Sequence, residues 1–266
     1  GGGAPRCRFK GGRFKGGGMS MSRQGLDSAS GVVLSRSVAG EGDLLLALFL
    51  KGRGLVRASA RGAAGGRVRF GGGTEPLVWG AFRLHRGRGG GAYLSAVDVA
   101  DGMIPLRRRP EALRTAVRWS KLLLRHLMAE HPADDLLANL YWNMRLLGMP
   151  RVPPEAAEWR FLWRWITAWG LAPDLTRCAR CGRPAVPLFW TDEGLACAAC
   201  GPGAGRPRFS GEDLSLLRRT AGADVHGVER YGELGELDGA RGLFALASRC
   251  VGGLLSQDIR DIGYRR

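Results

Sequence analysis

The sequence of 266 residues predicts an α+β protein with more than one domain. Three observations carry this prediction. Strand-like runs fill residues 31–101, helical periodicity begins at residue 110, and two C-x2-C pairs lie within residues 178–200. Apolar residues make up 45% of the chain, enough for a sizeable core. No apolar run approaches the roughly 18 residues that a membrane-spanning helix needs, so we expect no membrane contact.

The beginning of the chain is strongly basic. Residues 1–70 contain 13 Lys and Arg against 3 Asp and Glu, a net charge of +10 out of +16 for the whole chain. This imbalance indicates a polyanionic partner, most often nucleic acid; an arginine-rich composition without such a partner is the alternative. Glycine dominates residues 1–30, where we expect a disordered basic arm. The arm lacks the apolar segment of a signal peptide, and we expect a cytoplasmic location.

Residues 31–105 are expected to form a small β-barrel. The strand-like runs are 31–38, 43–50, 54–61, 75–86 and 91–101, and glycine-rich turn sequences separate them. Five short strands suit a closed barrel, for which the OB-fold is the commonest five-stranded example. An SH3-like barrel is the alternative, because the pattern does not give the order of the strands.

The third strand-like run carries arginines on one side. Alternation places Arg57, Ser59 and Arg61 on one face of the strand and apolar side chains on the other. Basic side chains in such a row can neutralise phosphates without reading sequence. With their basic neighbours they form the predicted DNA-binding set, which consists of Arg53, Arg57, Arg61, Arg67 and Arg69.

Residues 106–266 are expected to form a helical domain. The expected helices are 110–131, 134–148, 154–170, 210–222 and about 239–257. In the first of these helices we expect one apolar side, formed by Leu113, Val117, Leu123, Leu124, Leu127 and Met128.

Two polar or aromatic features of these helices have alternative interpretations. The first helix carries a basic stripe that consists of Arg114, Arg118, Lys121 and Arg125. The stripe is either an ordinary solvated face or a binding site. Four tryptophans of the helix at 154–170 alternate with Arg160 and Arg164. We expect most of these rings to pack in the core, with base stacking as the alternative.

Four of the six cysteines lie in the stretch CARCGRPAVPLFWTDEGLACAAC. The spacing C-x2-C, fifteen residues, C-x2-C is typical of a zinc knuckle, which we place at residues 176–203. Four thiolates complete a tetrahedron, so the predicted Zn²⁺, one per chain, is structural. An iron–sulfur centre, disulfides and metal-free thiols are the alternatives. The predicted ligands are Cys178, Cys181, Cys197 and Cys200.

No catalytic motif accompanies these cysteines. The sequence contains no GxxxxGK[ST], HExxH, GxSxG or HxE motif, and its four histidines are scattered. Carboxylates are sparse, and none cluster as a Mg²⁺ site would require. We therefore expect a binding protein and no enzyme.

Several stretches resemble the bacterial RecO family of DNA repair proteins. GLAPDLTRCARCGRP at 170–184 is similar to the family's segment G-[YL]-x-P-x-L-x-x-C-x-x-C-G. GEGDLLLALFLKGRGLVRASARGA at 40–63 and EPLVWGAFRLHRGRGG at 75–90 look like the family's N-terminal strand segments. The matching segments follow the family's order from about residue 31 to residue 220.

The resemblance implies a DNA repair and recombination mediator of the RecF pathway that works on the bacterial nucleoid. Such proteins bind single- and double-stranded DNA without sequence preference and anneal complementary strands. With the partner RecR they help to load RecA onto single strands coated by single-stranded-DNA-binding protein (SSB). The family also implies a contact between the acidic C-terminal tail of SSB and the helical domain, and our candidate site is the basic stripe.

The sequence departs from the family in places. The linker after residue 63 carries only Arg67 and Arg69 as charges, and the C-terminal SQDIRDIGYRR lacks an expected basic run. Two other classes stay open. A DNA glycosylase with a zinc finger needs a nucleophile near its start. The other class is a zinc-ribbon transcription or ribosome-associated factor, which would be favoured if the chain recognised a specific nucleic-acid sequence.

Overall fold

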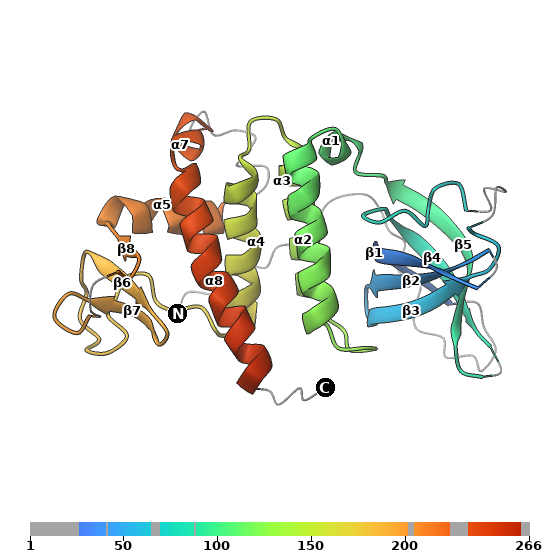
Figure 1. The fold of residues 1–266 in the computed structure, drawn as a ribbon, viewed down its shortest axis with the longest axis horizontal. Helices are drawn as coiled ribbons and strands as arrows, with labels where there is room; N and C mark the ends of the chain where they lie inside the picture. Colours follow the sequence, from blue (N-terminus) through green and yellow to red (C-terminus); the bar gives the residue numbers. More distant parts are fainter. Residues whose placement is uncertain are drawn as a thin grey trace, which may run out of the picture.

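The computed structural model describes residues 27–40, 42–64, 70–87, 89–201, 205–223 and 234–261. Three parts follow one another along the longest axis of the molecule: a β-barrel, a group of helices and a small sheet (Figure 1). The barrel and the small sheet therefore lie at opposite ends. Residues 1–26 of the expected arm lie outside the described residues, whereas its last four residues, 27–30, belong to the first strand.

The barrel consists of β1 (Asp27–Ala39), β2 (Asp43–Leu50), β3 (Gly54–Ala60), β4 (Trp79–Arg86) and β5 (Ala92–Asp101). The strands close in the order β1-β2-β3-β5-β4. β3 and β5 pair in parallel, and the other pairs are antiparallel. The predicted OB-fold is confirmed, and the SH3-like alternative is set aside.

Alternation along the strands separates the two faces of the barrel. Side chains inside the barrel include Leu46, Leu48, Ala58, Phe82 and Leu94, all buried. Their neighbours in sequence point outward. Some of these outward residues are covered by the helices, and the others form the exposed surface of the barrel.

The helices that follow are α1 (Ile104–Arg107), α2 (Pro110–His126), α3 (Asp134–Gly148) and α4 (Pro154–Ala168). α3 has the predicted bounds, while α2 ends five residues before the expected residue 131. α2 and α4 begin with proline, whose missing N–H would have no partner in the first turn anyway. α1 was not expected, because a single turn leaves no periodicity.

The expected apolar side of α2 is confirmed for Leu123, which is buried, and for Leu113, Leu124 and Leu127, which are partly buried against the core, but not for Val117 and Met128. The helix buries Ala112, Ala116, Trp119 and Leu123, whereas Val117 is 38% exposed and Met128 lies beyond the helix end and is 66% exposed. The physical reason is close packing: the two alanines let the α2 backbone approach its neighbours, and the room left beside them is filled by the Trp119 ring. That ring stacks on Phe161 of α4 with centroids 4.4 Å apart.

The tryptophans of α4 confirm the packing interpretation for the inner rings. Trp159 and Trp165 are buried, so neither is available to stack on a base. Arg160 is also buried, and it donates to the Ala223 carbonyl at 2.8 Å and to Asn143 Oδ1 at 2.9 Å. Arg160 therefore joins α4 to Asn143 of α3 and to the Ala223 carbonyl.

Three further helices complete the domain: α5 (Gly211–Gly222), α7 (Leu234–Gly239) and α8 (Arg241–Asp261). α5 begins with a capping box, in which Ser210 Oγ accepts from the Asp213 amide at 3.1 Å and Asp213 Oδ2 accepts from the Ser210 amide at 2.7 Å. The helix expected at about 239–257 is α8, whereas α7, which precedes it, was not expected. α8 runs along α4 (Figure 1). Among the helices that the structure describes, none combines the length and apolarity needed to cross a bilayer.

The barrel and the helices share one core. Phe49 and Trp79, on the outer face of the barrel, belong to the same buried cluster as Trp119 and Met144. The Trp79 indole Nε1 donates to Met144 Sδ at 3.4 Å. The boundary expected at residue 105 is thus a packed junction between two parts that support each other.

Candidate metal centre and nucleic-acid interface

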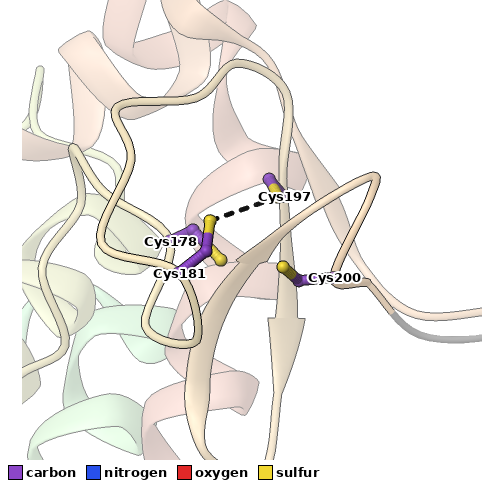
Figure 2. Close-up of side chains that lie close together, drawn as sticks. All are labelled: Cys178, Cys181, Cys197 and Cys200. Atoms are coloured by element: carbon purple, nitrogen blue, oxygen red, sulfur yellow. Dashed lines mark hydrogen bonds between the residues drawn. The ribbon is translucent and has the colours of Figure 1, made fainter.

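The four predicted metal ligands come together at the end of the molecule opposite the barrel. Cys178 and Cys181 lie in the loop after α4, Cys197 ends β7 (Gly194–Cys197), and Cys200 lies in the following turn. β7 pairs with β6 (Leu188–Thr191) in a hairpin between the two cysteine pairs, and β8 (Arg208–Phe209) joins β6 on its other side. The four sulfurs point toward one another (Figure 2).

The sulfur positions suit a tetrahedral site. All four lie within 4.8 Å of one another. The Sγ atoms of Cys181 and Cys197 are 3.9 Å apart, and four thiolates at zinc would be about 3.8 Å apart for Zn–S bonds of about 2.3 Å. A disulfide would need about 2.0 Å between two sulfurs, so these cysteines are free thiols here.

The electrostatics also favour a cation among the sulfurs. Backbone amides of Cys197 and Cys181 donate to the Cys178 sulfur and lower the pKa of Cys178 to about 6. Hydrogen bonds to Cys181 and Cys197 raise the pKa of Cys200 to about 12. Four thiols this close do not all ionise unaided, whereas a bound divalent cation deprotonates its thiol ligands.

A glycine follows each cysteine pair, as the sequence predicted, and each has its own reason. Gly182 has φ +69°, a left-handed conformation that favours glycine. At Gly201 an added Cβ would lie 2.6 Å from the Cys197 carbonyl oxygen, too close for any side chain. Both glycines let the chain turn tightly beneath the sulfurs.

Arginines surround the sulfur cluster. Arg183 is hydrogen-bonded to Cys181, which raises the pKa of Arg183, and Arg180 Nη1 donates to the Cys200 carbonyl at 2.8 Å. Beneath the cluster, Leu188 and Phe209 are buried in the same core as the helices. The knuckle is therefore attached to the helical domain by apolar packing as well as through the cysteines.

At the other end of the molecule, the outer face of β3 carries part of the predicted DNA-binding set. Arg57 of β3 is exposed, and so is Arg61, which directly follows the end of the strand and lies over the Tyr93 ring of β5. Arg53 differs, because it lies in the turn before β3, pairs with Asp27 and is only one-third exposed. Burial lowers the pKa of Arg53. The two remaining members, residues 67 and 69, lie outside the described residues.

The neighbouring strands add groups to this surface that the sequence analysis did not select. Tyr93 of β5 lies beside His85 of β4, and the two rings stack with centroids 5.3 Å apart. Arg83 of β4 is exposed and pairs with Asp98 at 2.7 Å. The alternation of β4 could have indicated Arg83 and His85, but Tyr93 joins them only through the strand register.

The basic stripe on α2 is exposed along its length, and its members differ in their contacts. Arg118 is held by Glu158, with Nη2 at 3.0 and 3.1 Å from the two carboxylate oxygens. Beside it lies a hollow of about 280 Å³ whose lining includes Glu111 and Glu155. Arg114, Arg118 and Arg241 also line this hollow, so basic groups stand beside the acidic ones. The exposed stripe members are Arg114, Arg118, Lys121 and Arg125.

Comparisons with known proteins match both halves of the chain. The family described as "Recombination protein O N terminal" matches residues 21–103, and "Recombination protein O C terminal" matches residues 107–231. The DNA repair protein RecO of Anaeromyxobacter dehalogenans (strain 2CP-C) is 34% identical over 202 residues, which cover 73% of this chain and 78% of that protein. The DNA repair protein RecO of Cutibacterium acnes is 31% identical over 196 residues, 70% of this chain and 78% of that protein.

Proposed function

Because the chain belongs to the RecO family of DNA repair and recombination proteins, we propose that it binds single- and double-stranded DNA on its barrel and anneals complementary strands. The observation that carries the proposal is the exposed pair Arg57, on β3, and Arg61, directly after the end of β3. The role is binding and not catalysis. Family membership sets aside the glycosylase and the zinc-ribbon factor.

The physical basis of annealing is charge neutralisation. Two single strands repel each other through their phosphates, and a basic surface that contacts both backbones lowers this repulsion. Such contacts do not distinguish one sequence from another, which suits a protein that must act on any damaged site.

DNA binding at several salt concentrations tests this surface. Arg57→Ala with Arg61→Ala should weaken binding to all sequences alike and flatten the salt dependence by up to about one unit of slope for each phosphate that is no longer neutralised. Arg36→Ala is the matched control, since Arg36 is also an exposed barrel arginine, on β1, and is paired with Glu75 at 2.6 Å. Equal affinity and slope in the double variant and the control would refute the assignment.

We also propose the family's partners for this chain. In the bacterial cytoplasm it would act with RecR to load RecA onto SSB-coated single strands. Size-exclusion chromatography of the chain mixed with RecR, with and without DNA, tests the first step. Separate elution under both conditions contradicts the partnership.

For the acidic tail of SSB we propose the basic stripe of α2. Arg114, Lys121 and Arg125 are exposed, and the exposed Val117 between them offers an apolar contact. Reversing the charges of Lys121 and Arg125 should weaken binding of the tail peptide and leave DNA binding by the barrel intact. Arg118→Gln is the matched control, since Glu158 already holds this arginine. Unchanged peptide affinity would make the stripe an ordinary solvated face.

The metal we propose is one structural Zn²⁺, held by Cys178, Cys181, Cys197 and Cys200. A closed tetrahedral shell leaves no position for water or DNA, and the ion would fix the turn of the knuckle. Metal analysis of protein purified without added zinc tests this. About one zinc per chain is expected, and a folded metal-free chain or bound iron refutes it.

A further inference from the structure

Three strands of the barrel place a polar and aromatic row on its exposed face. Ser59 of β3 is the register partner of Tyr93 of β5, and Tyr93 is the register partner of His85 of β4. We call Ser59, Tyr93 and His85 the outer row. Its inward neighbours Leu84 and Leu94 are buried in the barrel, so the outer row faces away from the core.

The rings of the outer row are held in a fixed orientation. Tyr93 and His85 stack with an interplanar angle of 21°. The guanidinium carbon of Arg61 lies 4.6 Å from the centroid of the Tyr93 ring, a cation–π contact. His85 Nδ1 is hydrogen-bonded to Ser95 Oγ at 2.9 Å. A surface aromatic pair restrained from three sides loses little freedom when a ligand stacks on it.

The turn between β4 and β5 leaves room for the Tyr93 ring. An added Cβ at Gly87 would lie 2.5 Å from Tyr93 Cε2, so a larger residue there would displace the ring. Tyr93 is half-buried and His85 is exposed. The Tyr93 ring thus packs closely against Gly87 of the turn, while the His85 ring reaches the surface.

Charge along the same face suits a polyanion. Arg57 of β3 and Arg61, directly after β3, flank Ser59 in sequence, and Arg83 lies two residues before His85 on β4. Basic groups beside exposed rings are the combination that binds single-stranded nucleic acid, with phosphates on the cations and bases on the rings. A duplex keeps its base faces stacked on one another, so only an unpaired strand can use the rings.

We infer that the Tyr93–His85 pair is a stacking platform for the bases of single-stranded DNA, with Arg57 and Arg61 holding the adjoining phosphates. The inference rests on the proposed DNA binding by the barrel. It adds that the two rings contact the bases and that the two arginines contact the phosphates. Annealing would follow from this division. A strand held by its backbone and by a few stacked bases keeps its other bases free to pair.

The test compares oligothymidine with an abasic oligonucleotide of the same length, which carries the phosphates but no bases. The wild-type chain should bind oligothymidine about 5- to 150-fold more tightly, the range of stacking one base on an aromatic ring. His85→Ala with Tyr93→Ala should remove this preference without changing the salt dependence. His85→Phe with Tyr93→Phe is the matched control and should keep the preference. If the loss of Tyr93 disturbs the barrel, His85→Ala alone is the second variant, because it changes only an exposed side chain. It should reduce the preference for oligothymidine.

Each other outcome has a distinct meaning. Equal binding of both oligonucleotides by the wild-type chain refutes the platform and leaves DNA binding by the arginines standing. A preference that survives in the folded double alanine variant refutes the platform as well. Failure of the wild-type chain to bind either oligonucleotide overturns the proposed function itself.

Discussion

The docking of the barrel on the helices can be tested at one glycine. Gly54 begins β3 with φ +70°, and an added Cβ would lie 1.9 Å from the His131 carbonyl oxygen in the connection between α2 and α3. Gly52 has nearly the same backbone, φ +71°, but an added Cβ there meets nothing within 4 Å. Gly54→Ala therefore combines backbone strain with a clash, whereas Gly52→Ala has the strain alone.

The expected magnitudes follow from these two contributions. A left-handed conformation costs an L residue about 1–2 kcal/mol, which is the whole effect expected for Gly52→Ala. Forcing extra atoms into a packed contact adds about 1–3 kcal/mol, so Gly54→Ala should lower the free energy of unfolding by about 2–5 kcal/mol. For a chain of this size each kcal/mol lowers Tm by about 2–4 °C. The reduced unfolded-state entropy is the same for both variants and cancels in the comparison.

Thermal and denaturant unfolding of the two variants, side by side, measure the difference. The account predicts that Gly54→Ala is the less stable variant by the contribution of the clash. Equal stability would mean that the β2–β3 turn does not approach the α2–α3 connection, and the packed junction would be refuted.

Three other changes test separate parts of the structure. Cys181→Ser should lower the metal content and Tm but spare DNA binding by the barrel, because the knuckle lies at the opposite end (Figure 1); equal loss of DNA binding would contradict that separation. Arg160→Met leaves the Ala223 carbonyl and Asn143 without their buried donor and should cost about 2–4 kcal/mol in chemical denaturation; a neutral effect would show that these hydrogen bonds do not stabilise the fold. Ser210→Ala removes the α5 capping box and should lower the free energy of unfolding by about 1 kcal/mol. An unchanged unfolding midpoint would show that the capping box does not stabilise the fold.

The sequence predicts those features that depend on local pattern. Alternation and glycine turns predicted the five strands, and helical periodicity predicted the bounds of α3. The cysteine spacing predicted which sulfurs meet. Each of these features is set by residues close together in the chain.

The features that were missed depend on partners far away in the chain. Nothing near Arg118 indicates that Glu158 holds it, and nothing near Arg160 indicates the Ala223 carbonyl. Likewise Tyr93 joins His85 only because β5 pairs with β4 in one particular register. The expected apolar side of α2 included Leu123 but not Ala112 and Ala116, because large apolar residues were expected inside, whereas small residues allow helices to pack closely.

The central claim is that the outer face of the barrel binds and anneals DNA. The most direct measurement follows the annealing of complementary oligonucleotides coated with SSB, with the wild-type chain, the Arg57→Ala and Arg61→Ala double variant, and the Arg36→Ala control. Rapid annealing is expected with the wild-type chain and the control, and slow annealing with the double variant. Annealing no faster with the wild-type chain than without it, or equally fast with the double variant, would contradict the account.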